Sequence, residues 1–344
     1  MNNLISKKNN FTVQHIAGLD SIRFFSFLSV YLYHKFPAIF HYGYLGVDVF
    51  FILSSFLLSY LALNEIKLTG SFSRKLFFVR RTLRIWPLYF AIIIFCFFVL
   101  PCFKDFFSIE LSLPKNKIMW FLFLGNYDSY NYIFALKFLW SIAVEEQFYL
   151  FFLVLSFGFK KYFKFIPFIL ILFFIIYSFI VINFSISYYE KMAYYFINFS
   201  MGIMLAYITF YKKWNFNKIF LSIFLIASLS IILIDRIYFN DFFYKSILIY
   251  CFTCSIAAII YCFIKLKLQK LIFFKLTEYL GKYTYGLYIF HGFILSFPLL
   301  KKLKLNPVLE VSIDLCLIFL IAFISYQLFE KHFLKLKPRN QKAA

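Results

Sequence analysis

Apolar stretches of about 17–25 residues, separated by short polar loops, recur along almost the whole chain. That length allows an α-helix to cross the roughly 30 Å hydrocarbon core of a bilayer. A shorter apolar stretch at 118–125 would lie against the membrane surface or re-enter it. The pattern predicts an all-α, polytopic integral membrane bundle of about ten transmembrane helices. The predicted spans are 20–37, 44–63, 85–103, 138–158, 163–183, 192–211, 219–235, 243–264, 281–300 and 306–329.

The chain is organised in three segments. Residues 1–18 are polar, residues 19–330 form the predicted transmembrane domain, and residues 331–344 are a basic tail. Composition agrees, since 63% of the residues are apolar and the mean hydropathy is +0.81, whereas soluble domains are about 45–50% apolar. Arg23 interrupts the first apolar stretch, and no small-residue cleavage site follows it. We therefore expect no cleaved signal peptide.

Lysine and arginine are concentrated in alternate loops. Roughly two thirds of the 36 basic residues fall on one side of the predicted spans, together with both chain ends. Most acidic loop residues fall on the other side. Because cytoplasmic loops carry the basic excess, both termini are predicted to be cytoplasmic. The net charge of +21 then reflects topology, and no nucleic-acid partner is expected.

The first predicted span contains two polar side chains, Arg23 and His34, eleven residues apart. Eleven steps of about 100° return to within about 20° of the start, after a rise of about 16 Å. Both side chains therefore lie on one face of the helix, three turns apart. An arginine within a span costs about 2.5–3.5 kcal/mol on insertion scales, which favours a protein interior or a wet cavity around it. Alternatively, Arg23 snorkels to one interface and His34 belongs to the other.

Acidic side chains are predicted at the same depth as His34. With the first span running outward, Asp48 in the second span and Glu145 and Glu146 in the fourth fall near the outer face. A histidine beside a carboxylate is suited to general base catalysis, because the carboxylate orients the ring and stabilises its protonated form. Helix-end roles are the alternative for these carboxylates. His291, at mid-depth in the ninth span, is either a core histidine or part of the site.

Three arginines, Arg80, Arg81 and Arg84, precede the third span on the predicted cytoplasmic side. Arg81 and Arg84 share a helical face if the helix begins early. Guanidinium groups match phosphate oxygens in geometry, so these residues and Arg23 would form a site for a phosphorylated cytosolic ligand. The alternative is that they serve as topology signals. The six cysteines include one CxxC pair without companion ligands, so no metal site is expected.

Five ordered motifs resemble those of the membrane-bound acyltransferase family 3, which includes many bacterial O-acetyltransferases of surface polysaccharides. Arg23 and His34 match its Arg-x10-His signature. Four further stretches are similar to its other motifs: GVDVFFILSSF at 46–56, RRTLRIWPLY at 80–89, WSIAVEEQFYL at 140–150 and LGKYTYGLYIFH at 280–291. Ser55 stands where the family usually has glycine, and Thr284 where it often has serine.

The resemblance implies an enzyme that transfers an acyl group, acetyl above all, from cytosolic acyl-CoA to a hydroxyl of a cell-envelope glycan, such as O-antigen, lipooligosaccharide or capsule. It implies a multi-pass protein of the bacterial cytoplasmic (inner) membrane, with acetyl-CoA as donor substrate, a glycan or lipid-linked sugar as acceptor, and no metal. We expect a stand-alone form without a hydrolase-like extension. By residue, His34 would be the base, a carboxylate of Glu145, Glu146 or Asp48 would orient it, and Arg23, Arg81 and Arg84 would bind the donor.

Two other classes of protein compete with this interpretation. A transporter or flippase of lipid-linked sugars or polysaccharide would also explain buried charges and cytoplasmic arginines. It would predict repeat-related broken helices at the midplane, and the sequence has no such internal symmetry. A purely structural membrane scaffold does not predict an Arg–His stripe. The acceptor sugar, the acyl chain and the oligomeric state stay open at this point.

Overall fold

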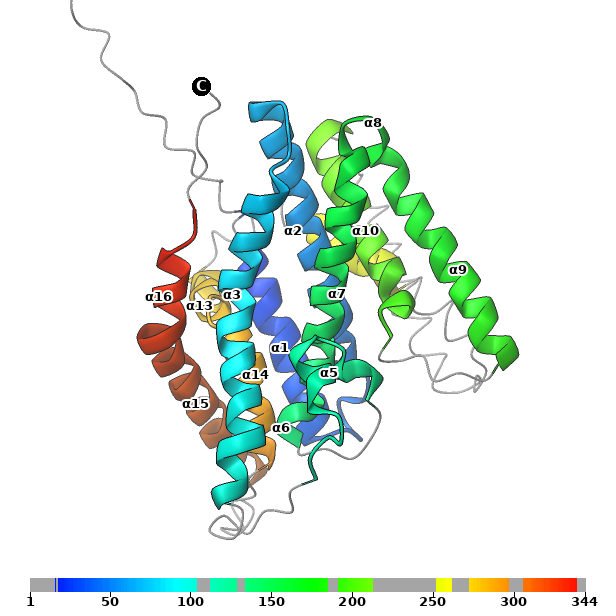
Figure 1. The fold of residues 1–344 in the computed structure, drawn as a ribbon. Coiled ribbons are helices and arrows are strands. Elements are labelled where there is room, and N and C mark those ends of the chain that lie inside the picture. Colours follow the sequence, from blue (N-terminus) through cyan, green and yellow to red (C-terminus); the bar gives the residue numbers. More distant parts are fainter. Residues whose placement is uncertain are drawn as a thin grey trace, which may run out of the picture.

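The computed structural model describes residues 16, 18–103, 112–128, 134–184, 191–212, 252–261, 272–296 and 306–338. Over these residues the regular structure is helical, with no strand, and Figure 1 shows the helices gathered in one bundle. The all-α prediction is therefore confirmed for the described part of the chain.

The described helices range from single turns to long helices. In chain order they are α1 (Leu19–Lys35), α2 (Gly46–Thr69), α3 (Arg74–Ile94), α5 (Lys117–Phe121), α6 (Phe134–Lys137), α7 (Leu139–Leu155), α8 (Phe159–Tyr162), α9 (Ile166–Phe184), α10 (Phe196–Tyr207), the helix Phe252–Tyr261, α13 (Ile272–Gly281), α14 (Thr284–Ser296), α15 (Pro307–Ser325) and α16 (Lys331–Lys335).

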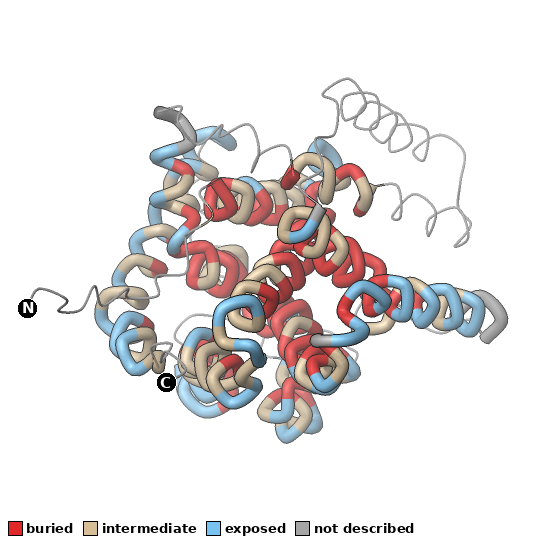
Figure 2. Tube along the Cα trace, turned by 90° about the horizontal axis from the view of Figure 1, so that it is seen from above, coloured by how far each residue is buried: buried red, intermediate tan, exposed pale blue. Residues whose placement is uncertain are grey.

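The helix α1 lies inside the bundle and packs against α2, α13 and α14. In Figure 1, α13 is seen nearly end-on beside the start of α1, so it crosses the direction of the long helices. Figure 2 shows that buried residues gather in the central helices, whereas exposed residues lie on the outer faces. These outer faces are apolar, as a bilayer requires; on α9 they include Phe168, Leu172, Ile175 and Phe179.

Within the described residues, six helical stretches are long and apolar enough to cross a membrane, as in a multi-pass membrane protein: 41–69, 74–103, 135–158, 163–180, 192–211 and 307–335. The first and ninth predicted spans correspond to shorter helices in the described residues, α1 with 17 residues and α14 with 13. The predicted span 219–235 lies outside the described residues, and 243–264 is described only over 252–261. The total of about ten spans and the cytoplasmic placement of both termini stay predictions.

The helix α3 begins at Arg74, well before residue 85, at which the predicted apolar span starts. Ser73 caps α3, because its side chain accepts a hydrogen bond from the Leu76 amide at 3.4 Å. Pro87 is accommodated inside the helix. As a result, the arginines at 80, 81 and 84 are on the helix itself, and Arg81 and Arg84 share one of its faces.

Glycines bring the central helices unusually close together, as small residues do in membrane bundles. A Cβ atom on Gly46 would overlap the Ser26 carbonyl of α1. A Cβ atom on Gly202 of α10 would overlap both the Ser55 side chain and the Ile52 carbonyl of α2. The helices α2 and α10 therefore pack closely although position 55 of α2 is a serine, because Gly202 of α10 supplies the small residue at this contact.

We predict that Gly202→Ala destabilises the protein by about 1–3 kcal/mol, since overpacking forces two backbones apart. The matched control is Gly158→Ala, whose new Cβ would meet its nearest neighbour at an ordinary 3.4 Å. Thermal unfolding in detergent micelles measures both. The double variant with Ser55→Gly should recover only part of the loss, because the Ile52 carbonyl remains in the way. Equal unfolding temperatures for the Gly202 and Gly158 variants would contradict the close α2–α10 contact.

Candidate functional site

A cavity of about 90 Å³ lies inside the bundle, between α1, α2, α3, α7 and the start of α14. Four residues expected in the site from the sequence line it: Arg23, Arg81, Arg84 and Glu145. We call the first three the cavity arginines. They come from two helices that are far apart in the sequence, and the early start of α3 is what brings its two arginines to this wall.

The cavity arginines gather positive charge along one wall of the cavity, where Arg23 and Arg81 are half-buried and Arg84 is exposed. Arg23 donates to Asp20 at 2.6 Å, as an i, i+3 ion pair on α1. Among the described residues, Arg81 and Arg84 have no carboxylate at ion-pair distance. Arg84 nevertheless interacts electrostatically with Arg23, Arg81 and Asp20. Buried Glu330, in the π turn after α15, also acts on Arg84. Guanidinium groups with unfilled hydrogen-bonding capacity suit an anionic ligand.

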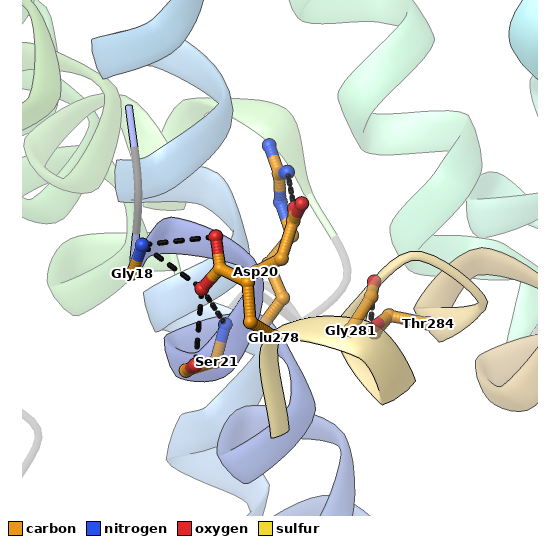
Figure 3. A network of polar contacts seen from close by, with 7 residues as sticks. Gly18, Asp20, Ser21, Glu278, Gly281 and Thr284 are labelled. Atoms are coloured by element: carbon orange, nitrogen blue, oxygen red, sulfur yellow. Dashed lines mark hydrogen bonds and ion pairs between the residues drawn. The ribbon is translucent and has the colours of Figure 1, made fainter. Parts of the chain in front are cut away.

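The start of α1 is held by a carboxylate from α13. Glu278 accepts hydrogen bonds from the Gly18 amide at 2.9 Å and from the Ser21 hydroxyl at 3.1 Å (Figure 3). A carboxylate at this position satisfies helix-terminal amides and complements the helix dipole. Gly281, which follows in the same turn, packs directly on the Asp20 backbone. The first turn of α1, and with it Arg23, is therefore fixed in direction.

The adjacent glutamates of α7 face different surroundings. Glu145 lines the cavity and accepts hydrogen bonds from the hydroxyls of Ser54 and Tyr149. Glu146 is buried against α3, where one oxygen accepts from the Trp86 indole at 3.1 Å. Its other oxygen, Oε1, has no hydrogen-bond partner among the described residues. Of the two, only Glu145 is in the cavity wall.

Asp48 belongs to another polar contact. Its carboxylate is buried and accepts from the Asn198 amide of α10 at 2.6 Å. Asn198 in turn accepts from the Thr253 hydroxyl at 2.8 Å. Residues 47, 50, 51 and 54 of α2 line the cavity, and Asp48 is about 100° around the helix from the first of them. The described contacts thus place Asp48 between α2 and α10 rather than beside His34, as the depth argument had suggested.

His34 lies in the last turn of α1 beside a second histidine. The ring of Phe138 packs against both, with centroid distances of 4.4 Å to His34 and 4.3 Å to His291. The two imidazole centroids are 5.9 Å apart. His291 is fully buried, and its Nδ1 bonds to the Tyr288 carbonyl. Since a carbonyl can only accept, Nδ1 is the donor in this bond, and in the neutral ring Nε2 has the lone pair; Nε2 has no partner among the described residues.

Two hydroxyls connect the cavity to this histidine pair. Ser141 and Tyr288 both line the cavity, and their oxygens are 2.8 Å apart. The Tyr288 ring is 5.2 Å from that of His291, one helical turn further along α14. The histidines therefore lie directly behind the cavity wall that faces away from the arginines. Along α1, the same path runs from Arg23 to His34, about 16 Å.

An ion network beside His34 was not anticipated from the sequence. Lys35 donates to Glu310 at 2.6 Å and to Asp314 at 2.7 Å, and the Tyr31 hydroxyl donates to Asp314 at 2.9 Å. The network ties the end of α1 to α15. The signal that could have found it is Asp314 itself, an acid in the middle of an apolar span, where a cationic partner is expected.

Comparisons with known proteins add an independent finding. The model of acyltransferase family 3, described as an acyltransferase domain, matches residues 16–327. A Staphylococcus aureus strain COL protein, provisionally named an O-acetyltransferase, is 33% identical over 165 residues, which cover 44% of this chain and 27% of that protein. The O-acetyltransferase OatA of strain NCTC 8325 is 32% identical over 159 residues, covering 43% and 26%. The chain thus matches about a quarter of the length of these relatives. No solved structure matches the chain.

Proposed function

The chain belongs to acyltransferase family 3, whose domain model spans most of it, and from this premise we propose that it is a membrane O-acyltransferase. It would transfer an acyl group, acetyl above all, from acyl-CoA to a hydroxyl of a cell-envelope glycan. The observation that supports this most is the cavity, which has cationic side chains at one end and a histidine pair behind the other.

The dimensions of the cavity suit the slender part of the donor. Its volume of about 90 Å³ is smaller than the roughly 150 Å³ of an apolar cavity that admits benzene. That volume excludes the nucleotide, so only the thioester end of the slender pantetheine arm would reach into the cavity. The nucleotide would stay at the mouth, where guanidinium groups of α3 can bind its phosphates in their bidentate geometry.

The sidedness of the reaction follows from the charge pattern. The end of the bundle where α2 stops and α3 begins is basic, with Lys67, Arg74 and Lys75 in the described structure. We infer that this end faces the cytosol, which supplies acyl-CoA. His34 is in the last turn of α1, at the other end of this helix from Arg23. The glycan hydroxyl would therefore approach from the outer face of the bacterial cytoplasmic membrane.

The chemistry assigns His34 the role of general base. Its imidazole takes the proton of the acceptor hydroxyl, and the oxygen attacks the thioester carbonyl carbon. The carbon–sulfur bond then breaks, and the leaving thiolate takes the proton from the imidazolium. In the neutral ring, Nε2 of His291 would accept a hydrogen bond from the His34 ring, directly or through one water. Glu145 acts from the donor side of the cavity, where it orients the Ser54 and Tyr149 hydroxyls.

Donor binding tests the arginine end of the proposal. Arg84→Lys should weaken acetyl-CoA binding about tenfold or more, because an ammonium cannot reproduce the guanidinium fork and a charge-assisted bond contributes about 1.5–3 kcal/mol. Isothermal titration of the detergent-solubilised protein measures the affinity. Arg74→Lys, at the exposed first residue of α3, is the matched control and should bind normally. Unchanged affinity for both Arg81→Ala and Arg84→Ala would leave these arginines with a topological role alone.

Removal of the base tests the other end. His34→Gln should reduce acyl transfer about 10²–10⁴-fold, because an amide forms hydrogen bonds but cannot take the proton. His41→Gln, an exposed histidine in the turn before α2, controls for the substitution itself and should keep its activity. The assay follows transfer from labelled acetyl-CoA to isolated envelope glycan, with thermal unfolding as the check of folding. A wild-type rate for His34→Gln would remove His34 from the chemistry.

A further inference from the structure

The segment that follows α16 returns to the surface of α3. The Arg80 guanidinium donates from Nε to the Pro338 carbonyl at 3.2 Å, and α16 packs against α3. Lys337 precedes this anchored carbonyl and is half-buried. By contrast, Lys331 and Lys335 of α16 are exposed, and Lys331 donates to Gln327 on its own helical stretch. The chain thus turns one lysine of its basic tail inward.

That lysine enters a cluster of like charges. We call Arg80, Arg81 and Arg84 the α3 arginines. Burial away from water, and then the nearby charges of these arginines, lowers the pKa of Lys337 to about 7. Three described carboxylates act on these arginines: Asp20 and Glu330 on Arg84, and Glu146 on Arg81. Four cationic side chains in such proximity repel one another, and an anion with several charges would relieve the repulsion.

We propose that Lys337 is a fourth cationic residue of the donor-phosphate site, which binds the nucleotide phosphates of acyl-CoA together with the α3 arginines and takes up a proton as the donor binds. This inference rests on the proposed function. It assigns separate tasks within the cluster: Arg81 and Arg84 line the cavity, Arg80 holds the tail segment in place, and Lys337, on which the charges of all three arginines act, would bind the phosphates that stay outside the cavity.

The proposal has a definite pH dependence. In the free protein Lys337 is protonated below its pKa of about 7, and a bound phosphate raises that pKa because it favours the charged ammonium. Binding is therefore tightest below pH 7 and weakens as the pH rises through 7. Between pH 6 and pH 8 the protonated fraction of the free protein falls from about nine tenths to about one tenth. An arginine at this position would stay charged throughout.

The experiment is isothermal titration of coenzyme A into the full-length protein in detergent, at pH 6, 7 and 8. Lys337→Ala should bind about tenfold more weakly than wild type at pH 6, and the difference should shrink by pH 8. Lys337→Arg should bind as tightly as wild type at pH 6 and keep that affinity at pH 8. Lys335→Ala is the matched control and should follow wild type. The ionisation of the ligand's own phosphate is common to all variants and cancels in these comparisons.

Two outcomes would overturn the inference in distinguishable ways. If wild type binds coenzyme A and Lys337→Ala matches Lys335→Ala at every pH, Lys337 is a tail charge without a role in donor binding, while the proposed function stands. If wild type does not bind coenzyme A at any of these pH values, the proposed function falls and this inference with it. Thermal unfolding of each variant confirms that the comparison is made on folded protein.

Discussion

Guanidinium groups that line a cavity in an otherwise apolar bundle are the constraint on which the rest of the structure depends. Each would be costly in a lipid environment on its own, so the helices that carry them must face one another around a polar space. Arg23 has an internal partner in Asp20, whereas Arg81 and Arg84 face the cavity without a described ion pair. The cavity and its positive charge are thus two consequences of one arrangement, and an anionic ligand is the natural complement to both.

The arrangement works only if α1 is held rigidly at both ends. At its start, Glu278 of α13 satisfies the first amides and Gly281 allows the α13–α14 turn to approach. At its end, Lys35 is bound by two carboxylates of α15. Between these points, Gly43 in the turn before α2 and Gly46 at the start of α2 allow this segment to pack directly on the α1 backbone. Arg23 and His34, about 16 Å apart, are therefore fixed relative to each other by one helix, as the proposed donor site and base require.

Much of this could be predicted from the sequence, because helical geometry relates Arg23 to His34 and Arg81 to Arg84 without any knowledge of neighbours. The sequence left the early start of α3 as a condition, since hydropathy identifies the apolar part of a helix and not its cap at Ser73. Asp48 shows a different limit. The depth of a side chain in the membrane follows from topology. Its direction around the helix axis can be interpreted only when the neighbouring helix is known, and for Asp48 that helix is α10.

The contacts that could not be predicted join residues far apart in the chain. Lys35 and Asp314 are 279 positions apart, and Arg80 and Pro338 are 258 apart. Each residue alone is typical of its segment, as a helix-end lysine or a basic tail. Only the fold shows that these residues close the two ends of the site. The second histidine belongs to the same class, because its position in the span did not indicate which ring it would meet.

The central claim is that one cavity connects a cytosolic donor with an acceptor on the other side of the membrane. Sealed inside-out membrane vesicles test it most directly, with labelled acetyl-CoA added outside and the glycan acceptor enclosed in the lumen. The account predicts label on the enclosed glycan, at a rate that depends on the protein and not on vesicle leakage. Transfer that occurs only when donor and acceptor share the outside, cytoplasmic face would contradict it.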